Sequence, residues 1–131
     1  MLVGLLRGDD FDRIRAMPDQ PLELTSRPGS QPGQTIVQPR GAINLGNSRS
    51  FQQALMAAAG TALIVDLSEV PYIDSAALGT LVHAYVNCQK NQRRLALVGL
   101  THRVRNVIKL SALEPLFQTY ANVAEAEEAL H

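Results

Sequence analysis

A carboxylate and a hydroxyl stand side by side at Asp74 and Ser75, directly before a segment whose apolar residues have helical spacing. The first turn of a helix has unpaired backbone N–H groups and the positive end of the helix dipole, and both favour a bound or attached phosphate. Serine and aspartate are also preferred helix caps, so the pair has a purely structural explanation as well. The two roles are compatible, and Ser75 is the best candidate for a hydroxyl that carries a switchable charge.

A second possible phosphoacceptor is Asp66, which ends an apolar run in the way that the acceptor of a response-regulator receiver does. A receiver also needs an acidic pair after its first strand to hold Mg²⁺, and a lysine late in the sheet. Here the early expected strands end near Ser26 and Pro39, each followed by arginine, and the late strand ends at Val98, followed by glycine. We therefore interpret Asp66 as a loop or cap residue.

Composition and spacing exclude several other kinds of site. The three histidines lack the paired spacing of a metal site, and the single cysteine, Cys88, excludes an internal disulfide and a CxxC motif. Twelve basic and twelve acidic side chains balance, so no general attraction to nucleic acid or to a membrane is expected. His102, Arg103 and Arg105 form a small basic group that would suit an acidic partner, although such groups are usually solvated. We expect no metal and no cofactor.

Hydrophobic periodicity and turn residues predict strands that alternate with helices after an initial hairpin. The expected strands are 22–26, 35–38, 61–67, 94–98 and 117–120, and the expected helices are 48–59, 75–90, 102–110 and 123–130. Asn47, Thr101 and Asn122 are suitable caps, and Gly60 is a suitable residue to end the first helix. This order predicts a single α/β domain: a mixed, mostly parallel sheet of four to five strands with about four helices packed against it.

Residues 1–20 have mixed charge and weak periodicity, and we expect them to be a flexible N-terminal extension of a domain that covers residues 21–131. The short apolar start lacks the basic region, the long apolar run and the cleavage site of a signal peptide. No apolar run approaches membrane-spanning length. The expected location is cytoplasmic.

The order of the elements, together with particular residues, resembles the STAS domain, which is named for sulphate transporters and anti-sigma factor antagonists. The resemblance covers roughly 22–130 and rests on Gly41–Asn44, Leu63–Leu67, Tyr72–Gly79 and Leu95–Gly99, followed by the helical segment 104–113. Each segment alone is weak, but all of them in order and at sensible spacing are fairly specific. The resemblance implies the STAS fold.

With no transporter helices attached, the chain resembles a stand-alone anti-sigma factor antagonist. In that family a partner-switching serine kinase phosphorylates the serine of a D-S-[ST]-G-L segment, and the unmodified antagonist binds the kinase or anti-sigma factor. A PP2C-type phosphatase restores binding. The resemblance places Ser75 at the phosphorylated serine and implies a protein that is not itself an enzyme, present as a monomer or weak homodimer. The partner-binding residues that it implies are Asn44, Asp74, Ala76, Ala77, Leu78 and Gly79.

The chain departs from the family pattern at three positions. Ala76 and Ala77 stand where the family usually has serine or threonine and then glycine, and Asn44 stands where it usually has aspartate. These changes keep the acceptor hydroxyl of Ser75 but remove groups that usually accompany it. A STAS module that is not phosphorylated and serves as a constitutive interaction or scaffold domain is therefore the alternative. A small-ligand- or nucleotide-binding STAS domain is a third, for which the sequence offers no dedicated pocket residues.

Overall fold

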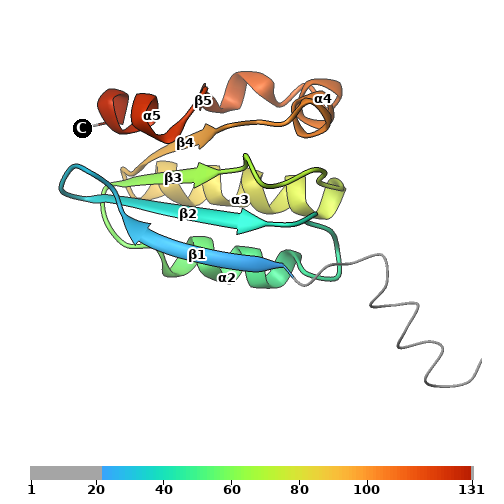
Figure 1. Ribbon diagram of the computed structural model, residues 1–131, viewed down its shortest axis with the longest axis horizontal. Helices are drawn as coiled ribbons and strands as arrows, with labels where there is room; N and C mark the ends of the chain where they lie inside the picture. Colours follow the sequence, from blue (N-terminus) through green and yellow to red (C-terminus); the bar gives the residue numbers. More distant parts are fainter. Residues whose placement is uncertain (1–21, 131) are drawn as a thin grey trace, which may run out of the picture.

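The computed structural model describes residues 22–130, which form a five-stranded mixed sheet with helices on both of its faces (Figure 1). The strands lie in chain order: β1 (Glu23–Pro28), β2 (Gln34–Arg40), β3 (Ala62–Asp66), β4 (Arg94–Val98) and β5 (Gln118–Tyr120). β1 and β2 form an antiparallel hairpin, and every later pair of neighbours is parallel. The predicted fold class and the mostly parallel sheet are confirmed.

The helices divide the core into two unequal parts. They are α2 (Ser48–Ala57), α3 (Ser75–Lys90), α4 (His102–Leu110) and α5 (Val123–Leu130), with a short 3₁₀ helix, η2 (Glu114–Leu116), before β5. Side chains alternate across the sheet, so Val65 and Leu97 join the larger core with α2, α3 and α4. Ile64 and Ala96 face the smaller core, which α5 covers. β3 is buried along its whole length, as the continuous apolar run predicts.

Two of the expected caps, Asn47 and Thr101, occupy the cap positions of α2 and α4, but their side chains bond to loop groups rather than to the helix. The Asn47 side chain accepts a hydrogen bond from the Asn44 N–H at 2.9 Å and donates to the Ala42 carbonyl at 3.0 Å, so it makes no cap bond to α2. The Thr101 hydroxyl donates to the Val70 carbonyl at 2.8 Å rather than capping α4. Asn122 is confirmed as a cap, because its side-chain oxygen accepts from the Glu125 N–H at 2.9 Å. At Asn47 and Thr101 the cap position is as expected, but the Asn44 N–H takes the Asn47 side-chain oxygen and the Val70 carbonyl accepts from the Thr101 hydroxyl.

The expected end of the first helix at Gly60 is also wrong. α2 ends at Ala57, because Ala58 takes an extended conformation with ψ of 126°. Gly60 has a φ of +100° and lies against the Gly33 carbonyl, where a Cβ would collide with that backbone. The same carbonyl accepts hydrogen bonds from the Thr61 and Ala62 N–H groups. Gly60 therefore permits the close approach of the β1–β2 hairpin to the start of β3.

The hairpin strands are longer than expected, because backbone pairing continues to Arg27 opposite Ile36 and Pro28 opposite Thr35. Among residues 22–130, no helix is long and apolar enough to cross a membrane. The predicted N-terminal extension, 1–20, lies outside the described residues.

Candidate functional site

The loops after β2, β3 and β4 meet at the carboxyl edge of the parallel strands, where α3 begins. The loop after β2 runs beside the loop after β3, with a parallel bridge between Ile43 and Ile73. Backbone hydrogen bonds join the Ile43 N–H to the Tyr72 carbonyl at 3.0 Å and the Asp74 N–H to the Ile43 carbonyl at 3.2 Å. This pairing fixes the start of α3 relative to the loop that contains Asn44.

Asp74 is the cap of α3. One oxygen of its half-buried carboxylate accepts from the Ala77 N–H at 3.0 Å, and the other accepts from the Leu45 N–H at 3.0 Å. A single carboxylate therefore satisfies a free donor of the helix and binds the neighbouring loop to it. Its negative charge is held in place directly before Ser75.

Ser75 is the first residue of α3, and its side chain is exposed. Because Asp74 caps the helix, the Ser75 hydroxyl takes no part in capping and makes no hydrogen bond with the other described residues. The capping explanation that the sequence offers for this pair therefore applies to Asp74. The hydroxyl of Ser75 is accessible for chemical modification.

The four residues after Ser75 differ in their exposure. Ala77 is fully buried and Leu78 is 8% exposed, so their side chains belong to the core in this structure, whereas Ala76 is half-buried. Gly79 is exposed, and a Cβ added to it would meet no atom within 4 Å. One turn of helix separates it from Ser75, so the two residues lie on the same face. Of the motif's residues, Ser75 and Gly79 form its accessible part.

The loop before α2 presents an apolar side chain that the sequence analysis did not single out. Leu45 is 77% exposed, although its N–H is bonded to the Asp74 carboxylate. The half-buried Asn44 shapes this loop, since its side-chain oxygen accepts from the Gly46 N–H at 2.9 Å. A leucine in the sequence Asn-Leu-Gly-Asn gives no signal of exposure, because only the loop pairing directs it outward. We refer to Leu45, Ser75 and Gly79 as the switch surface.

A cation–π contact borders the same edge. The guanidinium carbon of Arg103, in the first turn of α4, lies 4.7 Å from the centre of the Tyr72 ring. Tyr72 is 37% exposed and lies in the loop before α3. The basic group noted in the sequence thus lies beside the loops of the site rather than on a remote face, with Arg103 stacked on an aromatic ring.

Asp66 has structural partners at the end of β3. Its buried carboxylate accepts from the Gln38 side chain at 3.1 Å and from the Ser68 N–H at 3.0 Å. These bonds join β2, β3 and the following loop, as expected for a loop residue. Within residues 22–130, no group of three or more histidine, cysteine, aspartate or glutamate side chains is arranged to hold a metal ion.

Comparison with known proteins identifies the family. The STAS domain family matches residues 27–126 of this chain. An anti-sigma-B factor antagonist of Listeria monocytogenes is 34% identical over 59 residues, which are 45% of this chain and 52% of that relative. The chain therefore spans about half the length of this curated relative. A STAS-domain containing protein of Pseudomonas aeruginosa is 26% identical over 99 residues, which are 74% of this chain and 98% of the relative.

Solved structures have the same fold. The crystal structure of an anti-sigma factor antagonist from Mycobacterium paratuberculosis superposes with a TM-score of 0.75 at 24% sequence identity. The match covers 83% of this chain and 93% of that one. It extends the agreement from the family's sequence pattern to the arrangement of the sheet and its helices.

Proposed function

The chain belongs to the STAS domain family, and we propose that within this family it is an anti-sigma factor antagonist that acts by partner switching. In its unmodified form it binds an anti-sigma factor that is also a serine kinase, and phosphorylation of Ser75 releases it. A PP2C-type phosphatase restores binding, and the chain itself is a binding protein rather than an enzyme. The observation that carries the proposal is the exposed Ser75 hydroxyl at the first position of α3, which capping does not use.

Charge explains how this position would switch a protein interface. A phosphoserine adds about −1.5 to −2 charges and three acceptor oxygens. The N-terminal end of α3 accommodates part of that charge, whereas the fixed Asp74 carboxylate opposes it. A partner that covers Ser75 must remove water from the phosphate or face it with like charge. A cost of about 4 kcal/mol weakens a micromolar complex to the millimolar range.

The switch needs no rearrangement within the domain. Two hydrogen bonds from backbone N–H groups to the Asp74 carboxylate, together with backbone hydrogen bonds between the paired loops, already hold Leu45, Ser75 and Gly79 in place. Gly79 supports a close approach by another protein, because an exposed glycine inside a helix lowers stability relative to alanine and packing within the domain does not require it. The exposed Leu45 supplies apolar contact area at the same place.

The test is phosphorylation followed by binding. The protein is incubated with ATP and each serine kinase encoded near its gene, and the modified residue is located by mass spectrometry. The proposal predicts phosphate on Ser75, no phosphate on a Ser75→Ala variant, and its removal by a PP2C-type phosphatase. The exposed Ser50 on α2 is an internal control that should stay unmodified.

The second candidate function is a constitutive interaction module. The alanines at Ala76 and Ala77 and the amide at Asn44 favour it, because they replace groups that usually accompany the phosphorylated serine. It would use the same switch surface without modification. Binding of a partner to wild-type protein, with no phosphate on Ser75 from any of the tested kinases, would select this alternative.

A further inference from the structure

The edge of the sheet around Ser75 combines an exposed apolar side chain with exposed positive charge. Leu45 is 77% exposed, and its N–H is bonded to the Asp74 carboxylate at 3.0 Å, so the loop holds this side chain outward. Two arginines lie at the same edge: Arg49 in the first turn of α2, four residues after Leu45, and Arg103 in the first turn of α4. Both are exposed, and neither side chain makes a hydrogen bond or an ion pair with the other described residues. These apolar and cationic groups are available to a partner.

Arg103 is already oriented for a carboxylate. Its guanidinium carbon lies 4.7 Å from the centre of the Tyr72 ring. The Tyr72 carbonyl accepts from the Ile43 N–H at 3.0 Å, which joins this ring to the loop that contains Leu45. Stacking on a ring uses one face of the guanidinium and leaves its in-plane N–H donors free, and these donors match the two oxygens of a carboxylate. Because the side chain is held by the ring, less conformational entropy is lost when a carboxylate binds.

Phosphorylation of Ser75 reverses the sign of the charge at this edge. In the unmodified protein, Arg49 and Arg103 outweigh the Asp74 carboxylate by one positive charge. A phosphate of about −1.5 to −2 charges on Ser75 changes the balance to about −0.5 to −1. Two further charged residues, in the same loop and the same helix, are of opposite sign and leave this balance unchanged: Glu69 and Arg105. A partner that is attracted by the first state is repelled by the second.

We propose that the partner of the switch surface presents an acidic docking face, with a carboxylate that binds Arg103 and an apolar recess that receives Leu45. This inference rests on the proposed function and adds the chemistry of the partner. Phosphorylation then acts through like-charge repulsion as well as through the cost of removing water from the phosphate. A basic docking face does not fit, since it would be drawn more strongly to the phosphorylated form and would invert the switch.

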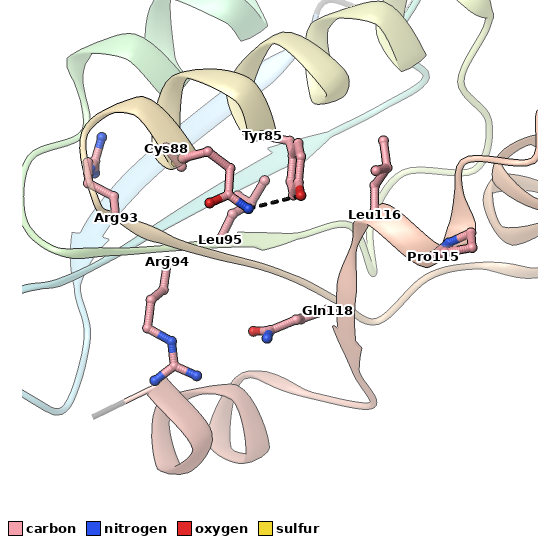
Figure 2. A pocket seen from close by; sticks show the side chains of 9 residues that line it. Tyr85, Cys88, Arg93, Arg94, Leu95, Pro115, Leu116 and Gln118 are labelled. Carbon is pink, nitrogen blue, oxygen red and sulfur yellow. Dashed lines mark hydrogen bonds between the residues drawn. The ribbon is translucent and has the colours of Figure 1, made fainter.

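The opposite end of α3 also has arginines beside it, but they do not form a shared surface. β5 pairs only with Ala96–Val98, which leaves a hollow of about 360 Å³ beside Arg94. Figure 2 shows the side chains of Arg93 and Arg94 on opposite sides of β4. The Arg93 Nε donates to the Gly60 carbonyl at 2.6 Å, so this guanidinium is used within the domain. Arg94 is exposed and lies at the other end of β4 from Arg103, which makes it the matched control for a surface arginine.

The test measures how salt affects binding in the two charge states. Full-length protein, unmodified or with authentic phosphoserine at position 75, is titrated with the serine kinase that modifies Ser75, with ADP in place of ATP so that no phosphate is transferred. Calorimetry follows the unmodified form, and NMR titration follows the weaker phosphorylated form. Raising NaCl from about 0.05 to about 0.5 M shortens the Debye length to below about 5 Å. We expect this change to weaken the unmodified complex at least about threefold and to strengthen the phosphorylated one.

The outcomes separate this inference from the proposed function. If the phosphate weakens binding but salt affects both forms in the same direction, or does not affect the unmodified form, the docking face is not acidic and partner switching stands. If the unmodified protein does not bind the kinase, or binds it as well as the phosphorylated protein does, the proposed function fails and this inference fails with it.

Variants assign the two contacts. Arg103→Gln should weaken the unmodified complex about tenfold at low salt, Arg103→Lys should keep most of the affinity, and Arg94→Gln should change nothing. Leu45→Ala should weaken binding about tenfold at every salt concentration, because it removes apolar area rather than charge. Its control is Leu110→Ala, since Leu110 is 88% exposed at the far end of α4. Peak dispersion in NMR spectra checks that each variant is folded, and folded Arg103→Gln and Leu45→Ala variants that bind as the wild type does would overturn the proposal.

Discussion

The two ends of α3 have opposite physical properties. At the N-terminal end the Asp74 carboxylate is bonded to two backbone N–H groups, the loops are paired, and an exposed hydroxyl and an exposed leucine lie beside them. At the C-terminal end two arginines line a hollow, and one guanidinium nitrogen of Arg93 is buried with no acceptor among residues 22–130. A surface whose loops and helix start are already held by hydrogen bonds can dock a protein without reorganising.

The largest stability effect should come from Asp74. Asp74→Ala removes the helix cap and the bond to Leu45, and we expect the free energy of unfolding in urea to fall by about 2 kcal/mol. Asp74→Asn retains one acceptor oxygen for two donors and should lose about 1 kcal/mol. A loss below about 0.5 kcal/mol for Asp74→Ala would show that this carboxylate does not join the loop to the helix.

A smaller effect, of opposite sign, should follow from Gly79→Ala. The added methyl group meets no atom within 4 Å, so the gain in helix propensity should raise the free energy of unfolding by about 0.5–1 kcal/mol. If the partner approaches the backbone at Gly79, the same variant should bind it about tenfold more weakly, as measured by calorimetry.

Val86→Ala is the matched control for this prediction. Val86 is 42% exposed and lies about two turns further along α3, toward its C-terminal end. The variant also improves helix propensity but should leave partner binding unchanged. If the Gly79→Ala variant is more stable than the wild type but binds the partner equally well, Gly79 is not part of the docking surface.

The pH dependence of stability tests whether Cys88 is buried near the C-terminal end of α3. Because burial raises the pKa of its thiol in the folded state above the ordinary value of 9.0, deprotonation favours the unfolded chain. The stability associated with the neutral thiol is therefore full below pH 9.0 and is lost as the pH rises toward the folded-state pKa. Urea unfolding across this range should show a steeper loss for the wild type than for Cys88→Ala. Equal slopes would contradict the burial of this thiol.

The smallest effect should be that of Ser75→Ala. Asp74 supplies the cap, so loss of the Ser75 hydroxyl should change the free energy of unfolding by less than about 0.5 kcal/mol. A decrease of about 1 kcal/mol or more in the free energy of unfolding, measured by heat or urea, would show that the Ser75 hydroxyl caps α3.

The sequence predicted the long elements better than their connections. α3 and β4 have the expected bounds, because each has a strong apolar pattern with clear end signals. The hairpin was expected to be shorter, since Arg27 and Pro28 read as turn residues until backbone pairing places them in β1. Asn47 and Thr101 stand at the cap positions, but the conformation of the loops decides where their side chains bond: Asn47 to the loop just before it, and Thr101 to the distant Val70 carbonyl.

Prediction of the site was limited in the same way, because its geometry depends on contacts that a local sequence pattern does not show. The Asp74-Ser75 pair was visible as a carboxylate and a hydroxyl before a helix. Which of the two side chains caps α3 depends on which one reaches the Ala77 N–H, and the sequence does not show this. The exposure of Leu45 follows from pairing between two loops that are distant in sequence. The hollow beside Arg94 depends on the register of β5 against β4, which no local pattern encodes.

The central claim concerns the charge state of Ser75, and one measurement tests it most directly. Protein carrying authentic phosphoserine at position 75 and the unmodified protein are titrated with the same anti-sigma partner by calorimetry. The account predicts that the phosphate weakens binding at least about 100-fold, with native NMR shifts retained away from the start of α3. Equal affinities for the two forms would contradict partner switching and leave a constitutive module as the function of this surface.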